Sequence, residues 1–459
     1  MERRRSLAEV LPVIAGFAGL LLVWDFEARP LGFLLLVAGT FVALWRFSRR
    51  RSEITLGVLL GVAALVRGLL LPVPLSLSDD VYRYLWDGRV VLAGFDPYRL
   101  APEAPELEPL RDAVWERTAH REVQSVYPPL ALTLFSIAAA LPFDLFAWKG
   151  LMALFDLGSC WLLWVAARRT GRATGPVVWY AWNPLVVIES AGMGHLDAAG
   201  VCALLAGLVL LLAPGEGTGG PWRPSRPVLA GLAVAGAALI KLVPLVLLPL
   251  LLHRARSAAF AAALGAALVI GFAPMVAPSA GAPPGLVRYG VSWEFNGLAF
   301  EPLWRVIDRT GTAPAVKESL DLVRTRMARP ERLEPLYPFV YPQLLAKVVL
   351  AAGLVWVVLI GLLPRDPLEA AAWTLGGALL LSATLYPWYA LWALPLAALL
   401  RSPAWLVLSL SLQAAYLPRL FGWSAWPSAW LAVWAPFLGV AAWRLLRRAR
   451  AANGGAAPA

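Results

Sequence analysis

Residues 54–89 read ITLGVLLGVAALVRGLLLPVPLSLSDDVYRYLWDGR and join an apolar run to a segment of acids, arginines and aromatic residues. The run from Ile54 to Leu71 has the length that a helix needs to cross roughly 30 Å of hydrocarbon. Asp79 and Asp80 follow shortly after it, at the expected boundary of the membrane. Acids at the edge of an apolar protein are candidates for a functional site, because they are costly to keep there without a partner or a task.

A plainer interpretation of this segment is a surface ion network. If residues 80–89 are helical, Asp80, Arg83 and Asp87 lie on one face of the helix, where they are able to pair with one another. Two adjacent carboxylates also disfavour each other's ionisation unless a cation or a ligand is nearby. The rest of the chain is needed to decide between the two interpretations.

Composition identifies the class of protein. Of the 459 residues, 59% are hydrophobic and only 15% are charged, and many apolar runs of about 17 to 25 residues follow one another. This pattern predicts an all-α polytopic membrane protein. The net charge of +11 lies largely in short arginine clusters between the runs, so it reports orientation and not nucleic-acid binding. Cys160 and Cys202 lie within predicted spans, so neither a disulfide nor thiol chemistry is expected.

The arginine clusters are all expected in the cytoplasm, by the positive-inside rule. This path gives two cytoplasmic termini and about 14 crossings. The spans are predicted near 7–24, 31–46, 54–72, 149–167, 175–192, 196–213, 228–241, 242–253, 257–276, 339–363, 367–385, 388–400, 403–418 and 428–445. The runs 228–241, 242–253 and 388–400 are short for full crossings, and the first two fit one broken helix equally well. Residues 127–141 are assigned to a re-entrant or interfacial helix on the outer side.

Two long loops remain on the outer side, and they set the predicted organisation of the chain. The first loop is rich in aromatic residues, which favours an ordered structure, and loops of such length are usually functional or disordered. The predicted segments are two leading spans in 1–53, a catalytic membrane module in 54–276 that includes the first outer loop 73–126, the second outer loop 277–338, C-terminal spans in 339–450 and a disordered tail in 451–459.

Further polar and aromatic residues interrupt apolar sequence at the predicted outer ends of the spans. The candidate set is Tyr82, Arg83, Tyr127, His195, Asp197, Lys241, Trp388 and Tyr389. Each has an ordinary structural alternative: His195 and Asp197 can satisfy the backbone of a turn, Lys241 can extend to the interface, and the Trp-Tyr pair can belong to an aromatic belt. Their convergence on one side of the membrane favours a site, since belt residues alone occur on both sides.

The chemistry available to such a site is limited. The sequence contains no phosphate-binding glycine loop, nucleophile elbow, dinucleotide fingerprint or Cys/His metal cluster. It offers a carboxylate to take a proton from a hydroxyl, cations to stabilise a departing phosphate, and aromatic rings suited to a sugar. This set fits displacement at an anomeric carbon with a phosphate leaving group. One carboxylate acting as base favours inverting transfer over hydrolysis by two carboxylates.

Several of these segments together resemble a known family. They are Ser78-Asp79-Asp80-Val81-Tyr82-Arg83-Tyr84, Trp86-Asp87-Gly88-Arg89, Gly94-Phe95-Asp96-Pro97-Tyr98, Tyr127-Pro128-Pro129-Leu130, Asn183-Pro184-Leu185, Gly194-His195-Leu196-Asp197 and Lys241-Leu242-Val243-Pro244. In this order the chain resembles membrane glycosyltransferases of the GT-C type, and among them bacterial mannosyltransferases that use polyprenyl-phosphate mannose. The C-terminal third adds only Tyr386-Pro387-Trp388-Tyr389.

The resemblance implies an inverting enzyme of the bacterial cytoplasmic membrane that transfers a hexose, with mannose favoured, to an acceptor hydroxyl on the outer face. The donor is a polyprenyl-phosphate sugar, the acceptor a glycan or a lipid-linked glycan, and neither a metal nor a cofactor is expected. Asp79 or Asp80 takes the part of the catalytic base, with a slight preference for Asp79 because it lies further from Arg83. The other acid of the pair is expected to be held by Arg83 or by a backbone N–H. Lys241 and His195 take the part of the donor-phosphate contacts.

Two rivals come from other classes. Acids and broken helices inside a membrane also serve secondary solute transporters, and a flippase for lipid-linked glycans needs no catalytic base. The lack of two matching halves and the long first outer loop favour an enzyme. Transfer requires the Asp79–Asp80 pair and Arg83 to converge with Lys241, whereas transport does not.

Overall fold

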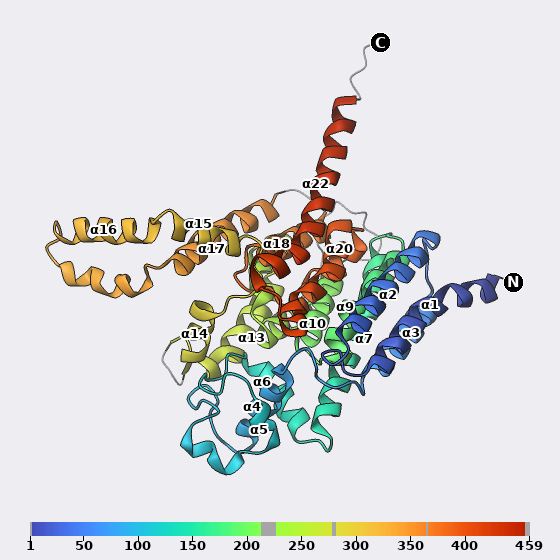
Figure 1. Ribbon diagram of the computed structural model, residues 1–459, viewed down its shortest axis with the longest axis horizontal. Coiled ribbons are helices and arrows are strands. Elements are labelled where there is room, and N and C mark those ends of the chain that lie inside the picture. The colour runs from blue at the N-terminus through green and yellow to red at the C-terminus, as the bar shows by residue number, and fades with distance from the viewer. Residues whose placement is uncertain (1, 213–225, 278–280, 364–365, 455–459) are drawn as a thin grey trace.

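The computed structural model is helical throughout the residues it describes, which are 2–212, 226–277, 281–363 and 366–454 (Figure 1). Within these ranges the β-type pairing consists of isolated bridges of Phe295 and Asn296 to Thr384. Figure 1 shows a bundle from which two parts project: the arm that contains α16 (Thr312–Arg324), and the end of α22 (Trp430–Gly454).

The first part of the chain supplies the elements around the site. They are α1 (Glu2–Val23), α2 (Pro30–Arg50), α3 (Leu56–Leu70), α4 (Asp80–Leu92), η1 (Pro105–Leu110), α5 (Ala113–Arg117), α6 (Pro129–Ala139), α7 (Asp144–Arg169), η2 (Gly175–Val177), α8 (Val178–Ala181), α9 (Pro184–Val187), η3 (Ile188–Gly192), α10 (Asp197–Leu211), α11 (Pro227–Ile240), η4 (Val243–Leu247), α12 (Leu248–Ala255) and α13 (Ala258–Val276).

The second part of the chain begins with α14 in the bundle, forms the arm that contains α16, and then returns to the bundle (Figure 1). Its elements are α14 (Pro284–Ser292), α15 (Phe300–Arg309), α16, η6 (Pro330–Phe339), α17 (Pro342–Gly361), α18 (Pro367–Leu381), η7 (Pro387–Trp392), α19 (Leu394–Leu399), α20 (Pro403–Ser411), η8 (Leu412–Tyr416), α21 (Leu417–Phe421), η9 (Ala425–Ala429) and α22.

Proline and short polar side chains set many of the helix starts. Pro30, Pro227 and Pro342 each open a helix, where the missing N–H would have no partner in any case. Thr55 caps α3 by accepting a hydrogen bond from the Val58 N–H, and Ser257 caps α13 in the same way. The apolar runs therefore become many helices of limited length.

Six helices in the described part of the chain are long and apolar enough to cross a membrane. They are Pro30–Arg50, Asp144–Arg169, Ala258–Val276, Pro342–Gly361, Pro403–Phe421 and Ala425–Arg450. A seventh span is formed if the two helices Pro184–Gly192 and Asp197–Leu211, which are bent by 115°, count as one. Shorter apolar helices include Leu56–Leu70, Pro227–Ile240 and Pro367–Leu381. The chain is thus a multi-pass helical protein with six or seven candidate spans by length and composition, and the expected total of about 14 crossings stays a prediction.

Several predicted spans are shorter or more broken than expected. Residues 242–253 divide into η4 and α12, and 388–400 divide into η7 and α19. The segment 127–141, predicted as a re-entrant or interfacial helix and not as a span, contains the 11-residue helix α6, which is too short for a full crossing. The last helix continues to Gly454, into the segment predicted as a disordered tail, and residues 455–459 lie outside the described part.

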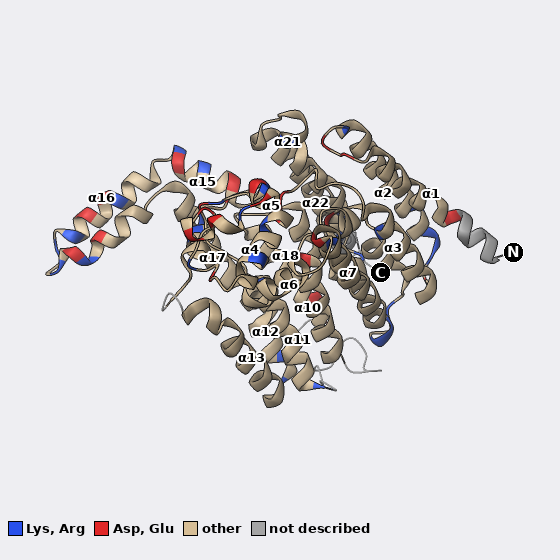
Figure 2. Cartoon of the chain, turned by 90° about the horizontal axis from the view of Figure 1, so that it is seen from below, with Lys and Arg blue, Asp and Glu red and all other residues tan. Residues whose placement is uncertain are grey.

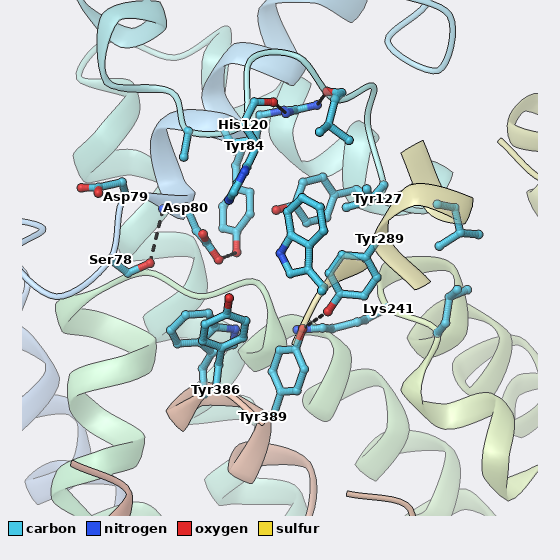
Figure 3. A pocket seen from close by; sticks show the side chains of 18 of the residues that line it. Ser78, Asp79, Asp80, Tyr84, His120, Tyr127, Lys241, Tyr289, Tyr386 and Tyr389 are labelled. Atoms are coloured by element: carbon cyan, nitrogen blue, oxygen red, sulfur yellow. Dashed lines mark hydrogen bonds between the residues drawn. The ribbon is translucent and has the colours of Figure 1, made fainter. Parts of the chain in front are cut away.

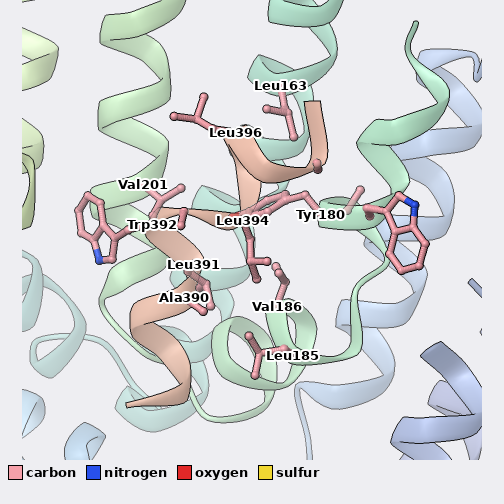
Figure 4. Packing of buried hydrophobic residues seen from close by; sticks show 14 of the residues in the cluster. Leu163, Tyr180, Leu185, Val186, Val201, Ala390, Leu391, Trp392, Leu394 and Leu396 are labelled. Atoms are coloured by element: carbon pink, nitrogen blue, oxygen red, sulfur yellow. The ribbon is translucent and has the colours of Figure 1, made fainter. Parts of the chain in front are cut away.

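The two parts of the chain pack into one another. Helix α10 lies between α7 and α11, and α11 packs on α13. Trp392 and Leu394, from η7 and α19, enter the core beside Leu185 and Val201 (Figure 4). Charged residues are concentrated in the arm and around α4 and α5, while α13 is almost free of them (Figure 2). The apolar core therefore fixes η7 against α9 and α10, and this contact positions the site.

Candidate active site

A cavity of about 470 Å³ lies where α4, the loop before α6, the end of α11, α14 and the segment before η7 meet (Figure 3). Its polar and aromatic lining residues are Ser78, Asp79, Asp80, Arg83, Tyr84, His120, Gln124, Tyr127, Lys241, Tyr289, Trp293, Ser382, Tyr386, Trp388, Tyr389 and Arg419. Most of the predicted site residues thus line one cavity, and Tyr82, His195 and Asp197 are the predicted residues that do not.

The two adjacent acids have different surroundings. Asp79 is the residue before α4, its side chain is 45% exposed, and one of its oxygens lies 3.4 Å from an Arg419 nitrogen. Asp80 begins α4 and points toward Tyr84 inside the cavity, whereas Asp79 points away (Figure 3). The chain direction at the start of a helix therefore separates the pair: Asp79 lies beside Arg419 at the exposed edge of the cavity, and Asp80 faces the interior of the cavity.

The Asp80 carboxylate has few hydrogen-bond partners among the described side chains, which leaves its oxygens available to a substrate. Among the described side chains, its hydrogen-bond donor is the Tyr84 hydroxyl at 3.4 Å, a long contact. Burial raises the pKa of the Asp80 carboxyl, and the Lys241 ammonium nearby opposes that rise. A carboxylate with a raised pKa and spare lone pairs is able to accept a proton from a group bound in the cavity.

Arg83 pairs with Asp87 and with neither acid of the Asp79–Asp80 pair. Its Nε donates to Asp87 at 2.8 Å, and its two terminal nitrogens donate to the backbone oxygens of His120 and Val123. The expectation that Arg83 holds the second acid of the pair is therefore wrong, because its donors already have these acceptors. Arg83 fastens the first outer loop over the cavity, and one edge of its side chain lines the wall.

Tyr82 lies on the other face of α4. Its hydroxyl accepts a hydrogen bond from Arg117 at 2.6 Å, and the Arg117 guanidinium lies over its ring. The side chain thus braces α5 against α4 and does not reach the lining of the cavity.

Gly88, further along α4, lets this helix approach α6 closely, because a Cβ there would lie 2.5 Å from the Phe135 carbonyl oxygen.

Lys241 and Asp197 form an ion pair beside the cavity. Helix α11 ends at Ile240, and Lys241 follows it in an extended conformation. Its Nζ donates to both carboxylate oxygens of Asp197 at 2.8 Å and lies 3.9 Å from the centre of the Tyr389 ring. Asp197 also accepts a hydrogen bond from the Trp392 indole. The anion that a desolvated Lys241 requires is thus supplied by the protein, and a bound phosphate would share the ammonium with Asp197.

His195 is fully buried behind the cavity wall. It follows Gly194, whose φ of +71° is typical of glycine and allows the sharp bend between η3 and α10. Its ring contacts Ser78, Glu189 and Trp388. His195 does not line the cavity, so the contact with the donor phosphate that the sequence suggested stays a prediction.

The aromatic residues stack mainly on one another. Trp388 lies between His195, at a centroid distance of 3.8 Å, and Tyr386, at 4.5 Å. Both faces of the Trp388 ring are therefore occupied, and only its edge is available to a sugar. Tyr389 contacts Lys241 with its ring and Tyr289 with its hydroxyl. Tyr127, which packs edge-on against Tyr84, presents the remaining predicted ring to the cavity.

Sequence reasoning missed several residues of the lining. Tyr84 and Tyr386 line the cavity and lie on the same segments as the predicted residues Asp80 and Trp388, but they were not singled out. Tyr289 and Arg419 also line it, and they come from α14 and α21, whose proximity no local pattern reveals. Their aromatic or basic character alone did not separate them from the many similar residues at span ends.

A second missed group lies deeper, below the cavity. Arg67 donates to Asp156 from Nε and a terminal nitrogen at 2.9 and 2.7 Å, and Tyr180 and Ser190 also donate to this carboxylate. The signal in the sequence was a charged residue inside each of two otherwise apolar runs, Arg67 in one and Asp156 in the other.

In the described part of the chain, no group of three or more His, Cys, Asp or Glu side chains is arranged to hold a metal ion.

Helices of membrane-spanning length thus surround a cavity that carries a carboxylate, a lysine and aromatic rings, which are the groups expected for transfer of a sugar from a lipid phosphate. Residues 11–256 match a family described as alpha-(1->6)-mannopyranosyltransferase, N-terminal domain. The match covers just over half of the chain and contains the segments from Asp79 to Lys241. The chain belongs to this MptA/B family of mannosyltransferases, and the resemblance to GT-C enzymes that depend on polyprenyl-phosphate mannose is confirmed. No curated protein and no solved structure matches the chain.

Proposed function

We propose that the protein transfers mannose, with inversion, from a polyprenyl-phosphate donor to a hydroxyl of a glycan or lipid-linked glycan. The acceptor oxygen attacks the anomeric carbon and forms the new glycosidic bond. The bond between that carbon and the phosphate oxygen breaks, and polyprenyl phosphate leaves with the electron pair. The family name gives the linkage as α-(1→6), so the attacking group is a 6-hydroxyl of the acceptor glycan.

The observation that carries this proposal is the placement of Asp80. Its carboxylate faces the cavity with one long hydrogen bond, and its pKa is raised by burial. As the base, Asp80 accepts the proton that the attacking hydroxyl loses. Asp79 is the weaker candidate because its carboxylate is largely exposed and lies beside Arg419. The preference therefore moves from Asp79 to Asp80.

Lys241 is the cation that we assign to the leaving phosphate. It lines the same cavity as Asp80, and its side chain is 22% exposed although it is paired with Asp197. An ammonium has three protons, so a phosphate is able to bind Nζ while Asp197 still holds the side chain. Electrostatic stabilisation of the departing phosphate is usually a large part of such catalysis.

An apolar groove next to the cavity suits the lipid part of the donor. This groove, of about 610 Å³, runs between η4 and the helices α17 and α18. Leu242, Val243, Ser382 and Tyr389 line both the groove and the cavity, so the two spaces adjoin. A polyprenyl chain in the groove would place its phosphate near Lys241. A soluble sugar-nucleotide donor would make no use of such a groove.

The site is proposed to face the outer side of the bacterial cytoplasmic membrane, in a path of about 14 crossings. In this path the helices α1, α3, α10, α11 and α18 and the broken segments 175–192, 242–253 and 388–400 would make the crossings beyond the six long helices, and the loops 73–126 and 277–338 would lie outside. The arginine clusters at 49–51, 168–172 and 447–450 would lie in the cytoplasm by the positive-inside rule. Enzymatic transfer is favoured over transport because the Asp80 carboxylate and Lys241 line one cavity that adjoins the apolar groove.

Product analysis tests the proposed reaction. Purified protein in lipid nanodiscs is incubated with polyprenyl-phosphate [¹⁴C]mannose and an α-(1→6)-linked mannose oligosaccharide. The expected result is an oligosaccharide one residue longer, labelled in a linkage that an α-(1→6)-specific mannosidase removes. Labelled free mannose alone would refute the proposal in favour of hydrolysis, and recovery of all the label as intact donor would refute transfer.

A further inference from the structure

His195 and Glu189 form a fully buried pair that the proposed chemistry does not use. The His195 Nδ1 atom lies 3.0 Å from a Glu189 carboxylate oxygen and 3.2 Å from the Glu189 carbonyl oxygen. The other carboxylate oxygen accepts a hydrogen bond from the Tyr416 hydroxyl at 2.9 Å. Keeping a carboxylate and an imidazole away from water is costly, so a purely apolar core would be the cheaper way to fill this space.

The second ring nitrogen of His195, Nε2, connects the His195–Glu189 pair to the start of helix α4. Nε2 lies 3.1 Å from the Ser78 hydroxyl oxygen, and the same oxygen accepts a hydrogen bond from the Asp80 backbone N–H at 3.3 Å (Figure 3). When Nδ1–H faces Glu189, Nε2 is left to accept the Ser78 hydroxyl proton. The lone pairs of Ser78 are then turned toward Asp80. The Nδ1 hydrogen bond goes to the Glu189 carbonyl oxygen, and the carboxylate oxygen 3.0 Å from Nδ1 has no hydrogen-bond donor among the described residues.

A series of stacked aromatic rings also fixes the orientation of the His195 ring. It stacks on Trp388 at an interplanar angle of 11°, Trp388 stacks on Tyr386, and Tyr386 stacks on Phe295. Phe295 is itself bound by backbone hydrogen bonds to the segment before η7. The imidazole therefore has little freedom to rotate, and the position of Ser78 is defined by the bundle and not by the loop that carries it.

We propose that Glu189, His195 and Ser78 are positioning residues that hold the start of α4 so that the Asp80 carboxylate faces the bound sugar. The inference rests on the proposed role of Asp80 as the base. It replaces a direct contact of His195 with the donor phosphate by an action through Ser78. A base that is misplaced by about 1 Å loses up to about 10²-fold in rate, so the effect of this chain of contacts should fall on turnover and not on donor binding.

The test is a set of variants with matched chemistry, measured for kcat and for donor and acceptor KM in nanodiscs. Ser78→Ala removes the link, and we expect kcat to fall about 10- to 100-fold while the donor KM changes less than about twofold. His195→Asn keeps an amide near Glu189 but does not reach Ser78, so its kcat should fall as far. His195→Gln places an amide near the Nε2 position and should retain more activity than His195→Asn.

Ser76→Ala is the matched control. Ser76 is a buried serine two residues before Ser78, and its hydroxyl oxygen accepts a hydrogen bond from the Phe26 N–H. Its removal costs a similar hydrogen bond outside the chain of contacts, so kcat should stay near the wild-type value. Thermal unfolding of each variant identifies any that fail to fold.

Three results would overturn the inference. They are normal turnover in Ser78→Ala, equal losses in the two His195 variants, and a donor KM that rises in proportion to the loss of rate. The last would return His195 to phosphate binding. If Asp80→Asn also keeps normal transfer, the proposed function fails; if Asp80→Asn is inactive while Ser78→Ala is normal, only the positioning role fails.

Discussion

Removal of Lys241 should have two separable consequences, one for folding and one for donor binding. In Lys241→Met, the Asp197 carboxylate has no exposed surface and loses the ammonium that lies 2.8 Å from both of its oxygens. Breaking a buried pair by removing one partner costs about 3–5 kcal/mol. The single variant should therefore unfold at a clearly lower temperature than the wild type, whatever the lysine does for the substrate.

The double variant Lys241→Met with Asp197→Asn isolates the effect on the donor. It removes both charges, and the amide oxygen that replaces the carboxylate would still accept the hydrogen bond from the Trp392 indole. Most of the lost stability should return. Donor binding should stay weak, because a hydrogen bond to a charged group contributes about 1.5–3 kcal/mol. At about 1.4 kcal/mol for each tenfold change, the donor Kd should rise about 10- to 150-fold.

Equilibrium binding of radiolabelled polyprenyl-phosphate mannose and thermal unfolding, both in the same nanodiscs, measure the two effects. A double variant that is stable and binds the donor with wild-type affinity would refute the phosphate role of Lys241. A double variant as unstable as the single one would show that the stability argument from the ion pair is wrong.

Three further outcomes are expected. Burial raises the pKa of Asp80, and a base must be deprotonated to act. The decrease of kcat/KM toward low pH should therefore have its midpoint above the ordinary aspartate pKa of about 3.9. A midpoint at or below that value would exclude Asp80 as the base. Arg67→Met, which leaves Asp156 unpaired, should lower the free energy of unfolding by about 3–5 kcal/mol, seen as a lower thermal midpoint; an unchanged midpoint would contradict this. A cysteine placed at Leu110 should react with a membrane-impermeant maleimide from outside intact cells, and one at Arg450 only after permeabilisation; the reverse pattern overturns the topology.

The helical class and the main candidate residues could be predicted because both depend on local sequence. Apolar runs and arginine clusters are read directly, and a lysine before a proline in an apolar run marks a break, which the structure has at the end of α11. The number of crossings is harder to predict. Pro244 and Pro249 give a short 3₁₀ segment and a short helix where the sequence suggested one span, so length alone does not decide whether such a run crosses.

Partners across the fold could not be predicted from spacing. Along α4, Arg83 has Asp80 on one side and Asp87 on the other, and spacing alone does not distinguish them. Its terminal nitrogens bind backbone oxygens of the first outer loop, and in that position its Nε donates to Asp87. Lys241 and Asp197 are 44 residues apart, and their pairing depends on how α10 meets α11. Trp388 has the right chemistry for a sugar, yet its neighbours in space cover both of its faces.

The most direct test of the account compares Asp80→Asn with Asp79→Asn in mannose transfer under saturating donor. A positioned carboxylate base contributes typically about 10²- to 10⁴-fold, so Asp80→Asn should lose that factor in kcat and still bind the donor. Asp79→Asn, which loses only an exposed contact to Arg419, should stay within about tenfold of the wild type, since exposed ion pairs contribute about 0–1 kcal/mol. Near-normal turnover in Asp80→Asn would contradict the central claim that this carboxylate is the catalytic base.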